Sequence, residues 1–418
     1  MDANDFERMQ SSFERFSTRF GAVFPRQESA RQMAQYLRAL LLTRERRTGP
    51  RLADTAGDVA PDKMQRLLYL TSWDADTARD ILQDLVVERL VEDRGVAVLK
   101  QMCFAKQGSD SVGVATQWNP GKGRRENCQV AALLVYVASR AEMIIDRGLF
   151  LPKEWLQDAR RRQKAKVPAE VVFRDMPEIA LSLITHARGR KVPMQWVSGD
   201  RIFGDSLPLR NSIRSLGIGY VFEISPETKI WMCRAGSAAS VATRSDFRQV
   251  IEEEDDLRED LEQVTAAGAM SRGLSDGWCR GGTGGEKNDQ ACFDWAAVPV
   301  REDIRGRGCT AWLLVSRSTD EPSTLLYHLA SVPGHPPLAR IARVAATIRI
   351  AERTIDEARD VAGLDQYHVR HWHSWHHHVT LSMMAYAWLK LVRASGGRMP
   401  RLDPLEALFF NTTSERGA

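Results

Sequence analysis

The hydrophobic periodicity of this chain changes near residue 95, and this change constrains the fold more than any other feature of the sequence. Before it, apolar residues such as Met9, Phe13 and Phe16 recur at the spacing of one helix face. After it come four apolar runs separated by turn residues: GVAVLKQMC, SVGVATQW, QVAALLVYV and AEMIIDRGLFLP. Short apolar runs bounded in this way are typical of strands. The sequence therefore predicts a helical N-terminal region followed by a strand-rich centre.

Later segments alternate between strands and helices. A helical region is expected over 153–190, and the longest helix is expected to stop at Gly363, a natural C-cap. The other expected elements are, in chain order, a strand at 192–200, a helix around 207–217, strands at 219–225, 311–318 and 325–333, the long helix at 338–363 and a last helix at 374–394. This order predicts an α/β fold.

The region 226–310 interrupts the pattern. It contains the acidic run EEEDD at 252–256 and the Gly-rich stretch RGGTGGEKND at 280–289. No GK[ST] follows these glycines, so a flexible loop is favoured over a phosphate-binding loop. We divide the chain into a helical N-terminal region at 1–92, a first core part at 93–225, an insertion at 226–310, and a second core part with C-terminal helices at 311–418.

Composition narrows the class of protein. The 418 residues are 43% hydrophobic and 27% charged, as in ordinary soluble proteins. The formal net charge of +4 permits a nucleic-acid partner without requiring one. The chain has no apolar run of membrane-spanning length, no signal peptide in its start MDANDFERMQ, and six cysteines without a CxxC pair. We expect a cytoplasmic protein with reduced cysteines and no membrane contact.

Five ordered stretches carry a resemblance to a known family. They are ERRTGPRLADTAGDVAPDKMQRLL (45–68), SVGVATQWNPGKGRRENCQV (111–130), IDRGLFLPKEW (145–155), WVSGDRIFG (196–204) and GLDQYHVRHWHSWHHHVTL (363–381). Through them, over about residues 20–395, the chain resembles bacterial insertion-sequence transposases of the DDE type. The resemblance implies an RNase H-like core, a mixed five-stranded sheet flanked by helices, with a DNA-binding helical N-terminal domain and an insertion before the last catalytic helix. It also implies duplex DNA as the partner and a homodimer or larger assembly.

The resemblance also indicates where the catalytic carboxylates of the family fall. The second family Asp matches Asp200, and the family Glu matches Glu352 when the helix is counted back from GLDQY. The first Asp belongs to a VLVxDETGFxKKG motif, and the ungapped match VAVLKQMCFAKQG places Lys100 at its position. In the family these residues hold two divalent metal ions for DNA strand cleavage and transfer.

A lysine at this position changes the expected chemistry. An ammonium has no lone pair for a metal ion and repels it, so magnesium binding is expected to be lost. Lys100 is expected to pair with Asp200 and Glu352 instead, which would explain how a lysine is tolerated in a buried strand. The sequence thus favours a catalytically inactive, domesticated transposase homologue that binds DNA without cutting it.

Two other classes of function stay open. A repurposed enzyme would use the former cleft for non-nuclease chemistry on a small molecule, with Lys100 or Cys103 as nucleophile beside Asp200 and Glu352. The sequence reveals no positioned base for Cys103, and a buried cysteine is ordinarily a small hydrophobe. A purely structural interaction protein would have neither a ligand pocket nor a basic stripe.

Basic residues supply candidate contacts to DNA phosphates. Five cations occupy residues 160–166 with no acid among them, which favours phosphate contact over a merely solvated helix face. Residues 52–70 have a helix-turn-helix-like pattern, although two packed core helices fit it better. The candidate contacts are Arg44, Arg46, Arg47, Arg51, Lys122, Arg124, Arg125, Arg160, Arg161, Arg162 and Lys164.

A histidine-rich segment lies between residues 368 and 378. On a helix, His373 and His377 share a face. A metal site would need a third ligand and supporting hydrogen bonds, so a phosphate-binding surface or a plain structural role is favoured. The segment contains His368, His371, His373, His376, His377 and His378.

Overall fold

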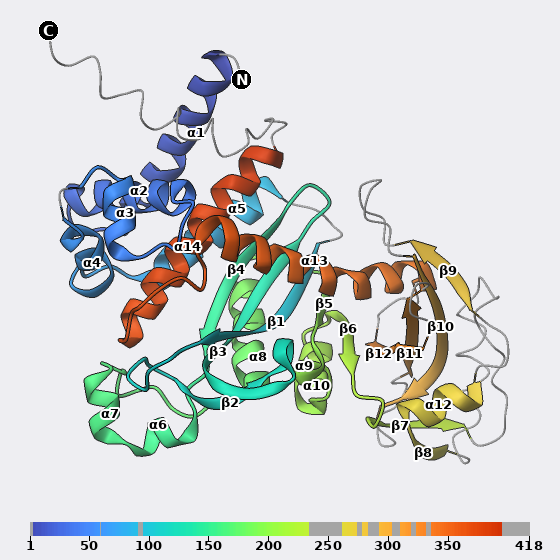
Figure 1. The fold of residues 1–418 in the computed structure, drawn as a ribbon. Helices are drawn as coiled ribbons and strands as arrows, with labels where there is room; N and C mark the ends of the chain where they lie inside the picture. The colour runs from blue at the N-terminus through green and yellow to red at the C-terminus, as the bar shows by residue number, and fades with distance from the viewer. Residues whose placement is uncertain are drawn as a thin grey trace, which may run out of the picture.

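The computed structural model describes residues 3–58, 60–90, 95–233, 261–273, 278–282, 292–302, 310–318, 323–331 and 336–394 (Figure 1). Helices begin and end this part of the chain, and a mixed sheet occupies its centre. The helices are α1 (Ala3–Gly21), α2 (Gln27–Leu42), α3 (Gly49–Thr55), α4 (Asp62–Tyr69), α5 (Ala75–Arg89), α6 (Lys153–Gln157), α7 (Ala159–Lys164), α8 (Met176–Gly189), α9 (Arg201–Gly204), α10 (Leu207–Ser215), α12 (Ala266–Gly273), α13 (Leu338–Ala362) and α14 (Trp372–Ala394).

Five strands form the first part of the sheet in the order β4-β3-β1-β5-β6. β1, β3 and β4 are antiparallel neighbours, whereas β5 and β6 run parallel to β1. The predicted mixed sheet flanked by helices is confirmed, and the arrangement is consistent with an RNase H-like core. The strands are β1 (Val96–Ala105), β3 (Arg124–Val137), β4 (Glu142–Leu149), β5 (Trp196–Gly199) and β6 (Gly219–Ile224), with β2 (Ala115–Asn119) paired to the start of β3.

Helices cover both faces of this sheet. Lys100, Leu133 and Arg147 are partners in one row across β1, β3 and β4, so their side chains share a face. α13 packs on this face, since it contacts Lys100. Gly148 faces the other way, and a Cβ there would collide with Ile179 of α8. α13 and α8 therefore lie on opposite faces of the sheet.

The N-terminal helices share one hydrophobic core with the sheet and with α14. Phe13 of α1 and Trp388 of α14 pack edge to face, with ring centres 5.2 Å apart. α3 and α4, which contain the helix-turn-helix-like pattern, both pack on α2. α4 buries Met64, Leu67 and Leu68. The favoured interpretation of these two helices as packed core helices agrees with these contacts.

The long helix is confirmed, and its end explains one glycine. Gly363 follows α13 with a φ of 62°, in the left-handed region that favours glycine. A Cβ there would lie 2.5 Å from Cδ of Arg47, so the chain also comes too close for a side chain. The last helix is confirmed as well, although it begins at Trp372.

Two predicted elements differ from the structure. Residues 165–175 are not helical, so the helical region predicted over 153–190 is interrupted between α7 and α8. Lys166 has a left-handed φ of 54° and Pro168 follows it, and neither suits a continuing helix. The strand predicted at 111–118 begins only at Ala115, whereas β3 extends back to Arg124 beyond its predicted start.

The described part of the region 226–310 extends the same sheet. From β6 the order continues β12-β11-β10-β7-β8, and this block lies along the N-terminal half of α13 (Figure 1). β10 lies before residue 310, the predicted end of the insertion, and pairs with β11, which begins at Thr310. The sheet therefore continues past the predicted boundary. The loop prediction is wrong for residues 280–282, which pair with β10, while 283–289 and the acidic run 252–256 lie outside the described residues. The strands are β7 (Lys229–Cys233), β8 (Leu261–Thr265), β9 (Cys279–Gly282), β10 (Cys292–Arg301), β11 (Thr310–Ser318) and β12 (Leu325–Ser331).

Candidate functional site

Three elements bring Lys100, Asp200 and Glu352 together. Leu99 and Gly199 form the last pair of the parallel β1–β5 ladder. The residues that follow them, Lys100 and Asp200, therefore lie next to each other at the end of this ladder. α13 packs over this point and contributes Glu352. The sequence predicted each of these elements, and the sheet order places their side chains in one site.

Lys100 is the centre of this site. Its Nζ donates one hydrogen bond to Asp200 Oδ1 and a second one, 2.8 Å long, to Glu352 Oε1. The lysine side chain is only 7% exposed, whereas that of Glu352 is 53% exposed. The backbone N–H of Gln101 donates to the other oxygen of Asp200 at 3.0 Å. The predicted pairing of the ammonium with both carboxylates is confirmed.

The charges around Lys100 keep it protonated. Burial alone would lower the pKa of the ammonium, but Asp200 and Glu352 outweigh that effect, and the pKa lies above its ordinary value. Burial raises the pKa of Asp200, although the lysine partly offsets this shift. Lys100 therefore remains an ammonium at neutral pH, and not the free amine that a nucleophilic lysine requires.

Glu223 is a further acidic residue of the site that the sequence did not reveal. It lies on β6, beside β5, and burial followed by the charge of Asp200 raises its pKa. A single Glu in a strand-like run carries no sequence signal of this kind, because its position depends on the parallel pairing of β5 and β6. α9 is held close to it, since a Cβ at Gly204 would collide with the Glu223 backbone.

These residues do not fit the pair of divalent metal ions that the DDE resemblance implies. Hard cations need oxygen ligands that converge on them. Here the ammonium of Lys100 lies between Asp200 and Glu352 and takes a hydrogen-bonding oxygen of each. It offers no lone pair itself and would repel a metal ion.

Cys103 is not activated for nucleophilic chemistry. Its sulfur lies 3.8 Å from the Trp118 carbonyl oxygen and 3.9 Å from Nε2 of Gln101. Burial, and then the neighbouring Cys128, raise the pKa of the Cys103 thiol to about 12. A thiol that stays protonated at neutral pH is a poor nucleophile.

A small cavity of about 190 Å³ lies beside the acidic residues, between α13 and strands β6, β10, β11 and β12. Glu223 and Glu352 line it together with His328, Trp295 and Arg349, whereas Lys100 does not. Burial lowers the pKa of His328 to about 4, so this histidine is neutral at physiological pH. Near the three site residues, this cavity best suits the hypothesis of a repurposed enzyme, but neither predicted nucleophile lines it.

Three of the predicted phosphate contacts are buried or half-buried and bound to backbone carbonyls. Arg47 is buried, and its Nε donates to the Leu40 carbonyl at 2.6 Å. Arg161 stacks on the ring of Trp155 at 3.8 Å and donates to backbone carbonyls. Arg162 donates to three carbonyls in the turn after α7. These arginines hold loops in place, which explains why a basic run need not face DNA.

The other eight predicted contacts are exposed, and they lie in three segments. Arg44 and Arg46 lie between α2 and α3, Arg51 lies in α3, Lys122, Arg124 and Arg125 lie at the β2–β3 turn, and Arg160 and Lys164 lie on α7. Several of them also have partners within the protein: Arg51 pairs with Glu45, Lys122 with Glu126 and Lys164 with Asp110, and Arg125 donates to the Thr116 carbonyl. Trp118, which is 53% exposed, pairs across the hairpin with Arg125. The sequence analysis did not single out this exposed aromatic, which adds a stacking surface to the basic turn.

The histidine-rich segment is largely structural. His378 accepts from or donates to Tyr36 Oη at 3.0 Å and contacts the Gly363 carbonyl at 3.0 Å. The ring nitrogens of His377 contact the carbonyls of Leu68 and Trp73 at 2.9 and 3.0 Å. In the part of the chain that the structure describes, no three His, Cys, Asp or Glu side chains are grouped to hold a metal ion. The interpretation as a structural cluster fits these contacts best.

Comparison with known proteins places the chain in a family. A family model described as DDE superfamily endonuclease matches residues 19–255, which is more than half of the chain and includes Lys100 and Asp200 but not Glu352. A search of curated proteins found no match. None of the helices in the described ranges is long and apolar enough to cross a membrane. The matched region contains the strands that carry two of the three site residues, and the chain belongs to the DDE superfamily endonuclease family, whose members are transposase-like.

Proposed function

We propose that this protein is a catalytically inactive, domesticated DDE-family protein that binds duplex DNA and does not perform two-metal strand cleavage. One observation carries the proposal: the ammonium of Lys100 takes an oxygen of both Asp200 and Glu352. A homodimer or larger assembly and a cytoplasmic location belong to the same proposal, and they rest on the family resemblance and the composition.

Displacement of Lys100 by a metal ion would be costly. The lysine side chain is only 7% exposed, so loss of its two carboxylate partners would leave an unpaired charge in the interior. Breaking a buried ion pair in this way costs roughly 3–5 kcal/mol, and the exposed side of Glu352 reduces that figure. The lysine therefore competes with a cation for the same oxygens.

The DNA-binding half of the proposal is supported by the family and by the exposed basic residues. Family membership implies DNA binding in general. Lys122, Arg124 and Arg125 surround a tight turn next to the exposed Trp118, and such a basic and aromatic arm suits a nucleic acid. Phosphate contacts of this kind give affinity that falls as salt rises.

The test measures duplex DNA binding against salt concentration, with and without magnesium, and assays strand cleavage in parallel. We expect salt-dependent binding without cleavage. Arg124→Gln should weaken binding and reduce the salt slope by about one, whereas Arg162→Gln, matched in charge but bound to carbonyls, should leave the slope unchanged.

Absence of binding at low salt would remove the DNA-binding proposal. Magnesium-dependent cleavage that disappears in Asp200→Ala would remove the proposal of inactivity. Equal loss of salt slope in the two arginine variants would show that the hairpin is not the contact surface.

A further inference from the structure

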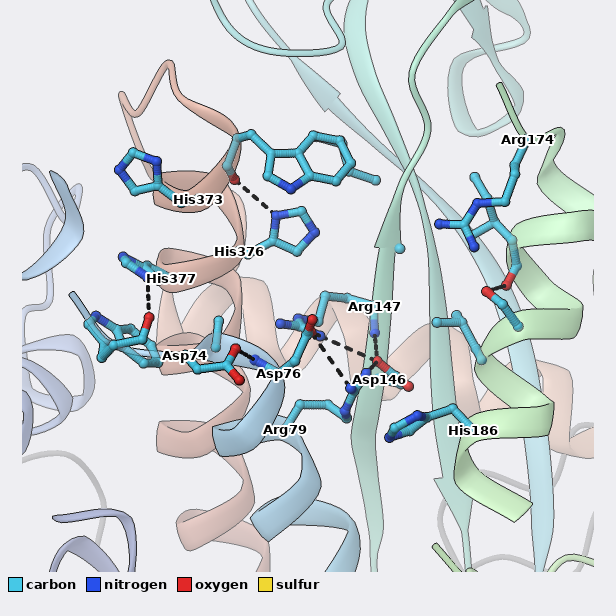
Figure 2. A pocket seen from close by; sticks show the side chains of 18 residues that line it. Asp74, Asp76, Arg79, Asp146, Arg147, Arg174, His186, His373, His376 and His377 are labelled. Carbon is cyan, nitrogen blue, oxygen red and sulfur yellow. Dashed lines mark hydrogen bonds and ion pairs between the residues drawn. The ribbon is translucent and has the colours of Figure 1, made fainter. Parts of the chain in front are cut away.

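A cavity of about 370 Å³ lies at the edge of the sheet, where α5, β4, α8 and α14 meet (Figure 2). Its walls combine the start of α5, the end of β4 and the first turns of α14, with Arg174 and His186 on the side of α8. A volume of this size is in the range of small-molecule sites. The cavity belongs neither to the Lys100 site nor to the exposed basic turn.

Arg147 of β4 is the most unusual residue of this cavity. Its side chain is only 1% exposed, and its Nη1 donates to Asp76 at 2.8 Å. Nε and Nη2 are also buried, yet neither has a hydrogen-bond partner in the described part of the chain. A buried charged donor without a partner costs more than an ordinary missing hydrogen bond. These two nitrogens therefore offer buried donors to a binding partner.

The two free nitrogens form one edge of the guanidinium. Nε–H and the adjacent N–H of Nη2 point in the same direction, and this pair of donors binds two oxygens of one phosphate or carboxylate group. The third nitrogen, Nη1, is used for Asp76 and lies 3.5 Å from Asp146. The internal ion pairs thus fix the arginine and leave its two-donor edge unused.

Arg79 provides a contrast within the same cavity. Its Nε donates to Asp80 at 2.6 Å, its Nη1 donates to Asp146 at 2.7 Å, and its Nη2 lies 3.6 Å from Asp76. Each nitrogen of Arg79 therefore faces a carboxylate, and this residue can be explained by structure alone. Arg147 cannot be explained in this way, because within the described ranges two of its three nitrogens have no hydrogen-bond partner.

The rest of the cavity is balanced in charge and carries aromatic rings. Arg79 and Arg147 balance Asp76 and Asp146, and the exposed Arg174 adds a positive charge that offsets Asp74 at the rim. Trp372 and His376 contribute aromatic rings, 4.7 Å apart between centres, to the wall. Such rings offer a surface on which a base or another flat group can stack.

We infer that this cavity binds a phosphate monoester, such as a nucleoside 5′-monophosphate, with two phosphate oxygens on the Nε–Nη2 edge of Arg147. The edge is shielded from water in this structure, so a ligand reaches it only if a side chain of the cavity wall moves. Arg174 lies on the other side of the cavity from His376 in Figure 2 and is exposed, which suits it to cover a bound phosphate. The same phosphate chemistry is offered by a free nucleotide and by a 5′-phosphorylated DNA end.

The experiment is calorimetric titration of the full-length protein with inorganic phosphate and thymidine 5′-monophosphate. We expect binding of both, with a rise in the thermal unfolding midpoint. Arg147→Lys keeps the charge and can keep the contact with Asp76, but it lacks the two-donor edge, and it should weaken binding about tenfold or more. Arg174→Gln should weaken binding less, and a change at the exposed Arg8 of α1, Arg8→Gln, should not alter binding.

Several outcomes would overturn the inference: no binding of either phosphate probe up to about 10 mM, unchanged binding in Arg147→Lys, or equal loss in Arg8→Gln. If Arg147→Lys does not fold, wild-type binding and the Arg174→Gln titration decide the matter. Comparison of 5′-phosphorylated with 5′-hydroxyl single strands separates the two ligand sources. The phosphate titrations contain no DNA, so their failure is distinguishable from failure of the proposed DNA binding.

Discussion

Two buried cations in one row across the sheet have opposite relations to their surroundings. Lys100 on β1 donates to the carboxylates of Asp200 and Glu352, which lie where metal ligands would be expected. Arg147 on β4, two strands away in the same row, contacts carboxylates with one nitrogen, and among the residues that the structure describes its other two nitrogens have no hydrogen-bond partner. A buried cation whose donors are paired can thus fill a metal site, whereas a buried cation with unpaired donors can indicate a binding site.

The largest expected effect is a loss of folding stability when Lys100 is replaced. Lys100→Met leaves Asp200 and Glu352 without their cation, and we expect the free energy of unfolding to fall by about 3 kcal/mol at neutral pH. Because the pKa of Lys100 is raised above 10.5, its contribution is fully present below pH 10.5 and is lost as pH rises through the folded value. Urea unfolding of both proteins against pH measures this.

The control for that prediction is Lys122→Met. Lys122 pairs with Glu126 at 2.8 Å, but its side chain is 47% exposed, so the change should cost less than about 0.5 kcal/mol. If Lys100→Met is as stable as the wild type at neutral pH, Lys100 is not the paired charge described above.

Acid should destabilise the region around Arg147, because two of the histidines that line the cavity there, His376 and His377, have strongly lowered pKa values. Burial, followed by Arg147, lowers the pKa of His376 to about 3, and burial lowers that of His377 to about 4. The unfolded chain binds protons near pH 6.5 that the folded chain does not, so stability falls as pH drops from 6.5 towards 4. At about pH 5 each such histidine costs roughly 2 kcal/mol.

The measurement compares the wild type with His377→Gln by urea unfolding at about pH 7 and pH 5. The variant cannot take up this proton, and its loss of stability between the two pH values should be smaller by roughly 2 kcal/mol. An equal loss in both proteins would mean that His377 is already charged in the folded state, and the acid sensitivity of this region would then need another source.

Local sequence patterns predicted much of the fold because they act over short distances. Apolar runs specified β1, β5 and β6, and Gly363 specified the end of α13. The same patterns missed the break at Lys166, because a left-handed φ on a lysine has no sequence signature. They predicted β11 and β12 but missed β7–β10, and they did not give the order in which these strands join the sheet, because strand order depends on pairing between distant segments.

The sequence predicted residues of the candidate site only where a family motif indicated them. Lys100, Asp200 and Glu352 followed from the family resemblance, and their ion pairs agree with it. Glu223 and the free edge of Arg147 could not be inferred, because each depends on what neighbouring elements leave paired or unpaired. Arg47, Arg161 and Arg162 show the reverse error, since a charge in the sequence does not reveal whether a carbonyl already binds it.

We propose that Lys100 occupies the space of a catalytic metal ion, and magnesium titration of Lys100→Asp measures whether it does. The change replaces an ammonium by a carboxylate beside Asp200 and Glu352, so calorimetry should detect magnesium binding that wild type lacks. Adding Asp200→Ala to the variant should abolish that binding. Magnesium binding by the wild type that is lost in Asp200→Ala, or no binding by Lys100→Asp, would contradict the account.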